Sequence, residues 1–219
     1  MPERKRNSSP LTESRSDLYW VLSTAMMSFL RIWMQGLYNP ARAFKRLQPK
    51  PAPYWGLWAI LLRFVVTALT SILALRILNR MPFYPSSLTF LPTEQYYTAQ
   101  IFFLPLFGLA CWLLAGALVH LILRGMGKQS DFDWILNVIG LGLLIPMPVT
   151  WLVDWISIAF DIYGSGLTPL IHSLISLWEI ALIAVGLAKM EEARPGVYIL
   201  LAALVKIGVY IPLAALFVR

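Results

Sequence analysis

The sequence has few of the residues on which enzymes and metal proteins depend. Its 219 residues include one cysteine, two histidines and 11 acidic residues, and charged residues make up only 13% of the chain. The cysteine, Cys111, lies within an apolar run, so no disulfide can form within the chain. Two histidines and one such cysteine do not make a zinc site. We predict no metal and no other cofactor.

Catalytic motifs are missing as well. The chain contains no HExxH, GxSxG or GxGxxG pattern and no Walker A loop. Ser165 lies in the short GSG turn at 164–166, with no histidine or acidic residue placed to activate it as a nucleophile. We therefore predict that the chain is not an enzyme.

Apolar sequence is what the chain has in excess. It is 58% hydrophobic with a mean hydropathy of +0.68, well above the usage of soluble domains. Five apolar blocks each reach the roughly 20 residues that a membrane-spanning helix needs. The sequence thus predicts an all-α, polytopic integral membrane bundle. Its five spans are expected at about 55–79, 97–123, 134–160, 168–188 and 196–218.

The distribution of basic residues predicts the orientation. Nine Lys or Arg precede the first span, and loops 124–133 and 189–195 carry two each, whereas loop 80–96 has one and loop 161–167 none. By the positive-inside rule, the N-terminus is cytoplasmic and the C-terminus lies outside. Because basic residues concentrate at the ends of apolar runs, the net charge of +7 indicates anionic lipid headgroups as partners, with no nucleic acid.

The membrane domain is predicted to cover residues 55–219. Before the basic helix and connector that lead into it, the sequence predicts two further segments. Residues 1–17 are polar and are predicted to be a flexible cytoplasmic tail. Residues 18–38 carry one polar stripe, which predicts an amphipathic helix lying on the membrane. At 21 residues this segment is also long enough to cross the bilayer, and that alternative stays open. The stripe consists of Thr24, Ser28, Arg31 and Gln35.

Residues 39–54 are predicted to form a short basic helix and a proline-rich connector. Asn39 followed by Pro40 is typical of a helix start. Phe44 and Leu47 are expected to enter the headgroup layer of the membrane. The basic side chains are expected to face anionic lipid or a protein partner, and they are Arg42, Lys45, Arg46 and Lys50.

Charged residues within the spans are rare in membrane proteins and suggest a function. Taking a rise of about 1.5 Å per residue, we predict one group near the midplane and a second nearer the outer end. The groups are Arg63, Glu179 and Lys206, then Arg76, Asp154 and His172. Three interpretations stay open: ion pairs that fix the helices, a polar cavity for an ion, proton or lipid headgroup, and snorkelling of single residues.

The third span contains the sequence GLGLLIPMPVTW at 140–151. Pro146 and Pro148 each remove a backbone donor from this helix. Such a pair can simply kink a long helix. Alternatively, it can produce a discontinuous helix that lines a binding site, as in some transporters.

Several blocks occur in an order that resembles a known family. NPARAF at 39–44 precedes the spans, Gly127 and Lys128 form a turn before Phe132, and the fourth span reads LWEIALIAVGLAKMEEA. With NVIGLGLLIP in the third span, these resemble the prokaryotic branch of the Yip family, five-span membrane proteins named for interacting with Ypt/Rab GTPases. The resemblance implies a helical bundle with a cytoplasmic N-terminus.

The chain also departs from its eukaryotic relatives. Asp17-Leu18-Tyr19 matches only the start of their DLYGP motif, and Gly140-Leu141 stands where they often have Gly-Tyr.

We predict a scaffold that organises the membrane or recruits partners at the cytoplasmic face of a prokaryotic plasma membrane. Its expected partners are lipids, copies of itself or other membrane proteins. The alternative is a small transporter, channel or lipid scramblase that uses the buried charges and the third span.

Overall fold

The computed structural model describes most of the chain, with gaps at the N-terminus, in four connections between helices and at the last residue. The described residues are 26–47, 54–82, 90–163, 166–190 and 196–218. Several predictions fall outside them and concern the tail at 1–17, residues 18–25, Ser165, Lys50 and the connector prolines at 49, 51 and 53.

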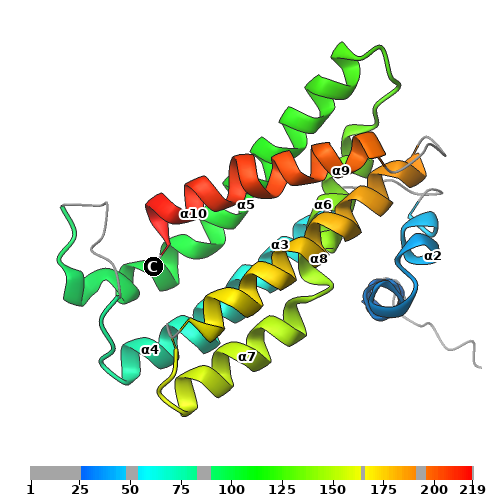
Figure 1. The fold of residues 1–219 in the computed structure, drawn as a ribbon. Coiled ribbons are helices and arrows are strands. Elements are labelled where there is room, and N and C mark those ends of the chain that lie inside the picture. Colours follow the sequence, from blue (N-terminus) through cyan, green and yellow to red (C-terminus); the bar gives the residue numbers. More distant parts are fainter. Residues whose placement is uncertain (1–25, 48–53, 83–89, 164–165, 191–195, 219) are drawn as a thin grey trace, which may run out of the picture.

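Five long apolar helices make up the membrane domain, which confirms the predicted fold class (Figure 1). The described residues contain no strand. Candidate spans run over Tyr54–Ile77, Thr93–Gly125, Phe132–Ala159, Leu167–Lys189 and Gly196–Phe217, each within a few residues of its predicted bounds. Their elements are α3 (Tyr54–Thr67), η1 (Ala68–Ile72), α4 (Leu73–Ile77), η2 (Thr93–Gln95), α5 (Tyr96–Gly125), α6 (Phe132–Leu144), α7 (Met147–Ala159), α8 (Leu167–Met190), α9 (Gly196–Ala203), η3 (Leu204–Tyr210) and α10 (Ile211–Phe217).

Helix α6 is the centre of the bundle. Every residue from Trp134 to Leu144 is buried, and the helix packs against α3, α5 and α8. At its contact with α3, Gly140 lies so close to Gly56 that an added Cβ would come within 2.6 Å of the Gly56 carbonyl oxygen. Asn137 Oδ1 also accepts a hydrogen bond of 2.7 Å from the Gly56 amide. Small residues therefore allow the close backbone approach that packs helices in membranes.

The third span consists of two helices, because α6 ends at Leu144 and α7 begins at Met147. Pro146 is the residue that precedes α7, and Pro148 lies in its first turn, where a missing backbone donor costs nothing. The Ile145 amide still donates to the Leu141 carbonyl over 2.9 Å, but Pro146 and Pro148 have no N–H for the carbonyls four residues before them. The Leu143 carbonyl finds a partner outside the helix, since it accepts a hydrogen bond from Arg63 Nη1.

Before the spans, residues 26–38 are helical and run across the direction of the long helices, beside α2 (Pro40–Lys45) (Figure 1). Asn39 Oδ1 accepts a hydrogen bond of 3.1 Å from the Arg42 amide and so caps α2. Phe44 and Leu47 are 0% and 2% exposed, and α2 packs against α8. The prediction that these two side chains enter the headgroup layer is therefore wrong. They anchor α2 to the bundle, with Phe44 close to Gly186 of α8.

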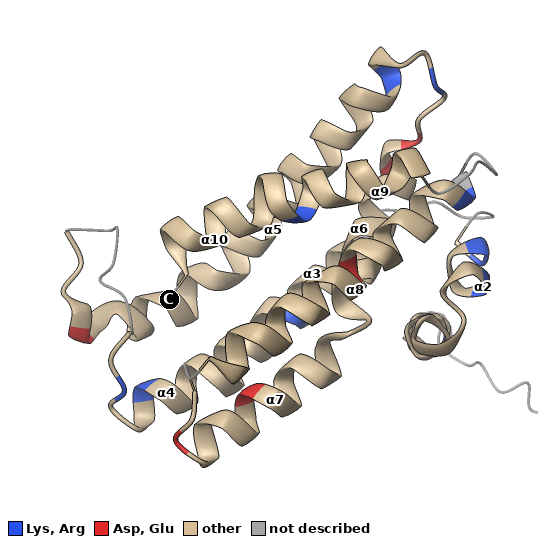
Figure 2. Ribbon diagram, in the orientation of Figure 1, with Lys and Arg blue, Asp and Glu red and all other residues tan. Residues whose placement is uncertain are grey.

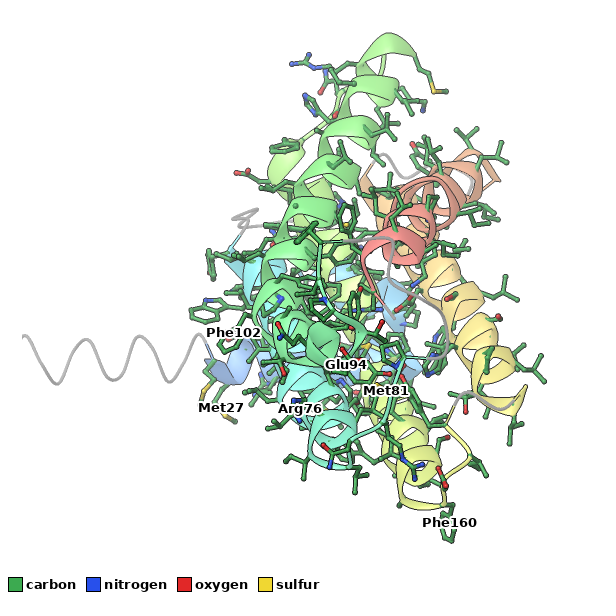
Figure 3. The ribbon with its side chains drawn as sticks, turned by 90° about the vertical axis from the view of Figure 1, so that its left-hand side faces the viewer. Met27, Arg76, Met81, Glu94, Phe102 and Phe160 are labelled. Carbon is green, nitrogen blue, oxygen red and sulfur yellow. The ribbon has the colours of Figure 1, made fainter. Side chains whose placement is uncertain are left out.

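The predicted polar stripe of the N-terminal helix is partly buried. Gln35 is buried and Ser28 is half-buried, although Arg31 is exposed. The exposed side of the described part is mainly apolar instead, with Met27 directed away from the bundle (Figure 3). Sequence periodicity identified the polar side of this helix, and packing against the bundle buries part of that side. The exposed apolar residues are Met26, Met27, Leu30, Met34 and Tyr38.

Candidate functional site

Three charged residues from three spans meet inside the bundle. Glu179 of α8 is 1% exposed, and each of its carboxylate oxygens has its own cation. Arg63 Nη1 of α3 donates to Oε1, and Lys206 Nζ of η3 donates to Oε2. We call Arg63, Glu179 and Lys206 the ion triad. With all three groups ionised, it holds two cations and one anion and so carries one positive charge in excess.

Arg63 joins the ion triad to the break in the third span. Its Nη1 group donates both to Glu179 and to the free Leu143 carbonyl at the end of α6. One turn further along, Thr67 Oγ1 donates to the Arg63 carbonyl over 2.8 Å and accepts a bond of 3.0 Å from Trp151 Nε1 of α7. The proline pair and the buried charge, which the sequence presented as separate features, are thus parts of one arrangement.

A second group of polar residues lies toward the predicted outer end of the bundle. Asp154 of α7 is buried, and its Oδ1 lies 2.8 Å from His172 Nε2 of α8. Its Oδ2 accepts a hydrogen bond of 3.2 Å from Ser71 Oγ of η1. We call Asp154, His172 and Ser71 the aspartate cluster. With a neutral histidine, this cluster carries one negative charge.

Arg76 does not belong to this cluster, so its assignment to the buried charge network is wrong. Its side chain is exposed near the end of the first span (Figure 3), and its Nε donates to Thr98 Oγ1 over 2.7 Å. Arg76 comes five positions after Ser71, and at about 100° per residue it points to a different side of the helix. Depth alone could not reveal this difference.

A partly open cavity of about 300 Å³ connects the ion triad with the aspartate cluster. Arg63 and Lys206 line one part of it, and Asp154 and His172 line another. Three further polar residues line it without a hydrogen-bond partner in the described part of the chain, although their atoms are buried. They are Gln100, Thr150 and Tyr210.

Sequence reasoning missed these uncharged residues, together with Ser71. Gln100 had a detectable signal, because an amide side chain in an apolar span is itself unusual. Ser71, Lys206 and Tyr210 share another signal that only the structure shows. They lie in η1 and η3, which are π-helical segments inside the first and fifth spans. Such segments occur frequently at functional sites.

A second cavity, of about 250 Å³, lies next to the first one. Arg80 Nη2 and Asp161 Oδ1 form an ion pair of 2.6 Å in its lining. Tyr163, in the connection between α7 and α8, lines both cavities. Burial raises the pKa of the Tyr163 phenol well above its usual range, and the nearby Asp154 carboxylate raises it further. Tyr163 therefore stays a neutral hydrogen-bonding group between the two cavities.

Basic residues gather at the opposite end of the bundle. Figure 2 shows Lys and Arg around α2, the turn between α5 and α6 and the C-terminal end of α8. On α2, Arg42, Lys45 and Arg46 are exposed while their apolar neighbours are buried. We call these three residues the α2 basic group. The other predicted basic residue, Lys50, lies outside the described residues.

The described residues include no group of three or more His, Cys, Asp or Glu side chains that could hold a metal ion. The other histidine, His120, lies at the cytoplasmic end predicted for the second span, where its Nδ1 is 2.5 Å from Ser130 Oγ. Its ring also contacts Phe132 edge-on. His120 thus lies apart from the cavity, whose lining does not include it.

Comparison with known proteins gives one match. The family model described as Yip1 domain matches residues 34–216, which include α2 and all five spans. No curated protein and no solved structure matches the chain.

Proposed function

The chain belongs to the Yip1 domain family, and on this premise we propose that it acts as a non-enzymatic scaffold. It would organise the membrane or recruit partners at the cytoplasmic face of a prokaryotic plasma membrane. Yip family proteins interact with other membrane proteins, and the family is not known for catalysis. The proposed partners are membrane lipids, further copies of the chain and other membrane proteins.

The docking of α2 is the observation that best supports this proposal. Phe44 and Leu47 fasten the helix to the bundle, so the α2 basic group has a fixed place at the basic end. A rigidly placed group loses less side-chain and backbone entropy on binding than a loose one. Each Lys or Arg near an anionic membrane surface contributes about 1 kcal/mol, so the three together contribute about 3 kcal/mol.

Site-specific crosslinking tests the scaffold. A photo-crosslinking residue placed at Lys45 should capture the same partner, or a second copy of the chain, in repeated experiments in cells. The matched position is Arg80, which is exposed and follows α4, at the end of the first span that is far from α2. Absence of any reproducible adduct at Lys45, together with a monomeric mass for the purified protein, would contradict the proposal.

The cavity favours a second candidate function, a small transporter, channel or lipid scramblase that moves ions or lipid across the membrane. A purely structural ion pair needs no space beside it, whereas here Lys206 and Arg63 line a cavity of about 300 Å³. Purified protein in liposomes should then transport ions or lipid, and Glu179→Gln should change the rate. The control is Glu94→Gln, at an exposed residue outside the cavity. A flux no higher than that of empty liposomes would exclude this candidate.

A further inference from the structure

We infer that the cavity between the ion triad and the aspartate cluster binds a phosphoethanolamine-type zwitterion, as found in the headgroup of phosphatidylethanolamine. The phosphate would lie toward Lys206 and Arg63, and the ammonium toward Asp154. This inference deepens the second candidate function, since it names the chemical class of the substrate. It requires only binding, however, and does not depend on movement across the membrane.

The charge pattern of the cavity is the first argument. The ion triad carries a net positive charge and the aspartate cluster a net negative one when His172 is neutral. A ligand with a single charge would match one cluster and leave the other without a counter-charge. Because buried charges are tolerated when they are paired, a ligand carrying both signs fits better than an anion or a cation alone.

The separation of the two clusters is the second argument. Glu179 and His172 are seven residues apart on α8, which corresponds to about 10 Å along the helix. Arg63 and Ser71 are eight residues apart in the first span, which corresponds to about 12 Å. Side chains reach into the cavity from both levels and shorten this distance. One molecule with its two charges a few bonds apart can therefore contact both clusters.

Unpaired polar groups supply the third argument. Gln100 is 0% exposed, yet neither atom of its amide has a partner in the described part of the chain. The hydroxyl groups of Tyr210 and Thr150 are also buried without a hydrogen-bond partner there. A buried polar group without a hydrogen bond costs free energy, so three of them around one cavity indicate a polar occupant. A phosphate offers several acceptor oxygens to such donors, and an ammonium offers donors to the Gln100 carbonyl.

The fourth argument is that the cavity lies between membrane-spanning helices, which favours a lipid headgroup as its ligand. Helix α10 is held against α5, because Tyr96 donates a hydrogen bond to the Phe217 carbonyl and the rings of Phe107 and Phe217 are 6.3 Å apart. Helix α8 packs against α9 and diverges from α10 (Figure 1), and residues of both α8 and α10 line the cavity. At about 300 Å³, the cavity is at the lower end of ligand pockets and suits a headgroup without its acyl chains.

The test measures binding of defined ligands to the full chain in detergent. The probes are short-chain phosphatidylethanolamine, the corresponding phosphatidylglycerol, which has no cation, and free phosphoethanolamine. We expect phosphatidylethanolamine to bind at least tenfold more tightly than phosphatidylglycerol. Gln100→Leu should weaken its binding about tenfold, since one or two hydrogen bonds are lost. Gln35→Leu is the matched control, because Gln35 is also buried with an unpaired amide oxygen but lies outside the cavity lining.

Each result of these binding measurements either supports or overturns the inference. Binding of both phosphoethanolamine and the lipid, or of the lipid alone, supports the inference, and the comparison identifies a soluble or a membrane source. Equal binding of phosphatidylglycerol, or native affinity in Gln100→Leu, would overturn it, as would an equal loss in Gln35→Leu. A liposome experiment without lipid movement, alongside selective binding, would reject transport and leave the binding site standing.

Discussion

Glu179→Gln is the substitution that tests the ion triad most directly. The amide has nearly the shape of the carboxylate, so packing changes little, but Arg63 and Lys206 then face each other without the anion between them. At an effective dielectric constant of about 20, two unit charges 4 Å apart interact by about 4 kcal/mol. Part of this is offset because the carboxylate no longer has to be desolvated. Breaking a buried pair by removing one partner costs about 3–5 kcal/mol in practice, and we expect a loss of that size.

Lys206→Met gives the comparison that makes the result interpretable. It removes the excess cation and leaves a one-to-one pair between Arg63 and Glu179, with an apolar side chain of similar length. Well-packed apolar replacements of buried charges are often neutral or stabilising. The loss of stability should therefore be about 1 kcal/mol or less, well below that of Glu179→Gln.

Thermal unfolding in detergent, followed by the fluorescence of the nine tryptophans, measures both variants. For a chain of this size, 1 kcal/mol shifts Tm by about 2–4 °C. Glu179→Gln should lower Tm by about 6–20 °C, whereas Lys206→Met should lower it by less than about 5 °C. Glu94→Gln, at an exposed position, should leave Tm unchanged. If Lys206→Met is as destabilising as Glu179→Gln, the description of Lys206 as an excess charge is refuted.

Three further predictions concern packing and orientation. Gly140→Ala should cost at least about 1–3 kcal/mol, since its Cβ would meet the backbone of α3, while Gly125→Ala, with nothing within 4 Å, should leave Tm unchanged. Phe44→Ala should cost about 3–5 kcal/mol, and a loss below 1 kcal/mol would show that α2 is not docked. Cys111 is buried, so Met126→Cys and Glu94→Cys are clean probes of orientation, and an impermeant thiol reagent should label intact cells at position 94 only.

Depth in the membrane could be read from the sequence, because each helical residue adds the same rise. The five spans followed from length and hydropathy. The same arithmetic placed Arg63, Glu179 and Lys206 at one level, and the structure brings their side chains together. Position along a helix is a property of one segment, so it needs no knowledge of how the segments pack.

Rotation about each helix axis could not be read in the same way. Arg76 was placed at the level of Asp154 but lies on a different side of the first span from Ser71, which bonds to Asp154. The π-helical turn of η1 within that span also changes the angle that an α-helix would give. Phe44 and Gln35 are buried because α2 and the N-terminal helix dock on the bundle, which no periodicity within the segments encodes. Thr150 and Tyr210 became significant only when the structure placed their hydroxyl groups at the cavity without hydrogen-bond partners.

The excess cation of the ion triad separates a structural role from a binding role. One carboxylate needs one cation to be neutral, so a second buried cation adds a desolvation cost that a purely structural pair avoids. Arg63 Nη1 already donates to both Glu179 and the Leu143 carbonyl, whereas Lys206 has one acceptor in the described part of the chain, Glu179 Oε2, for its three ammonium hydrogens. Lys206 is thus the cation with donors to spare toward the cavity.

This difference leads to a prediction in which stability and binding separate. If the ion triad only holds the helices, Lys206→Met should keep Tm and should also keep the affinity for phosphatidylethanolamine. If Lys206 meets the phosphate, the same variant should keep Tm within about 5 °C but bind the lipid at least tenfold more weakly, because a hydrogen bond to a charged group contributes about 1.5–3 kcal/mol. Parallel thermal unfolding and lipid-binding measurements decide between the two. Native affinity in a stably folded Lys206→Met protein would confine the ion triad to a structural role.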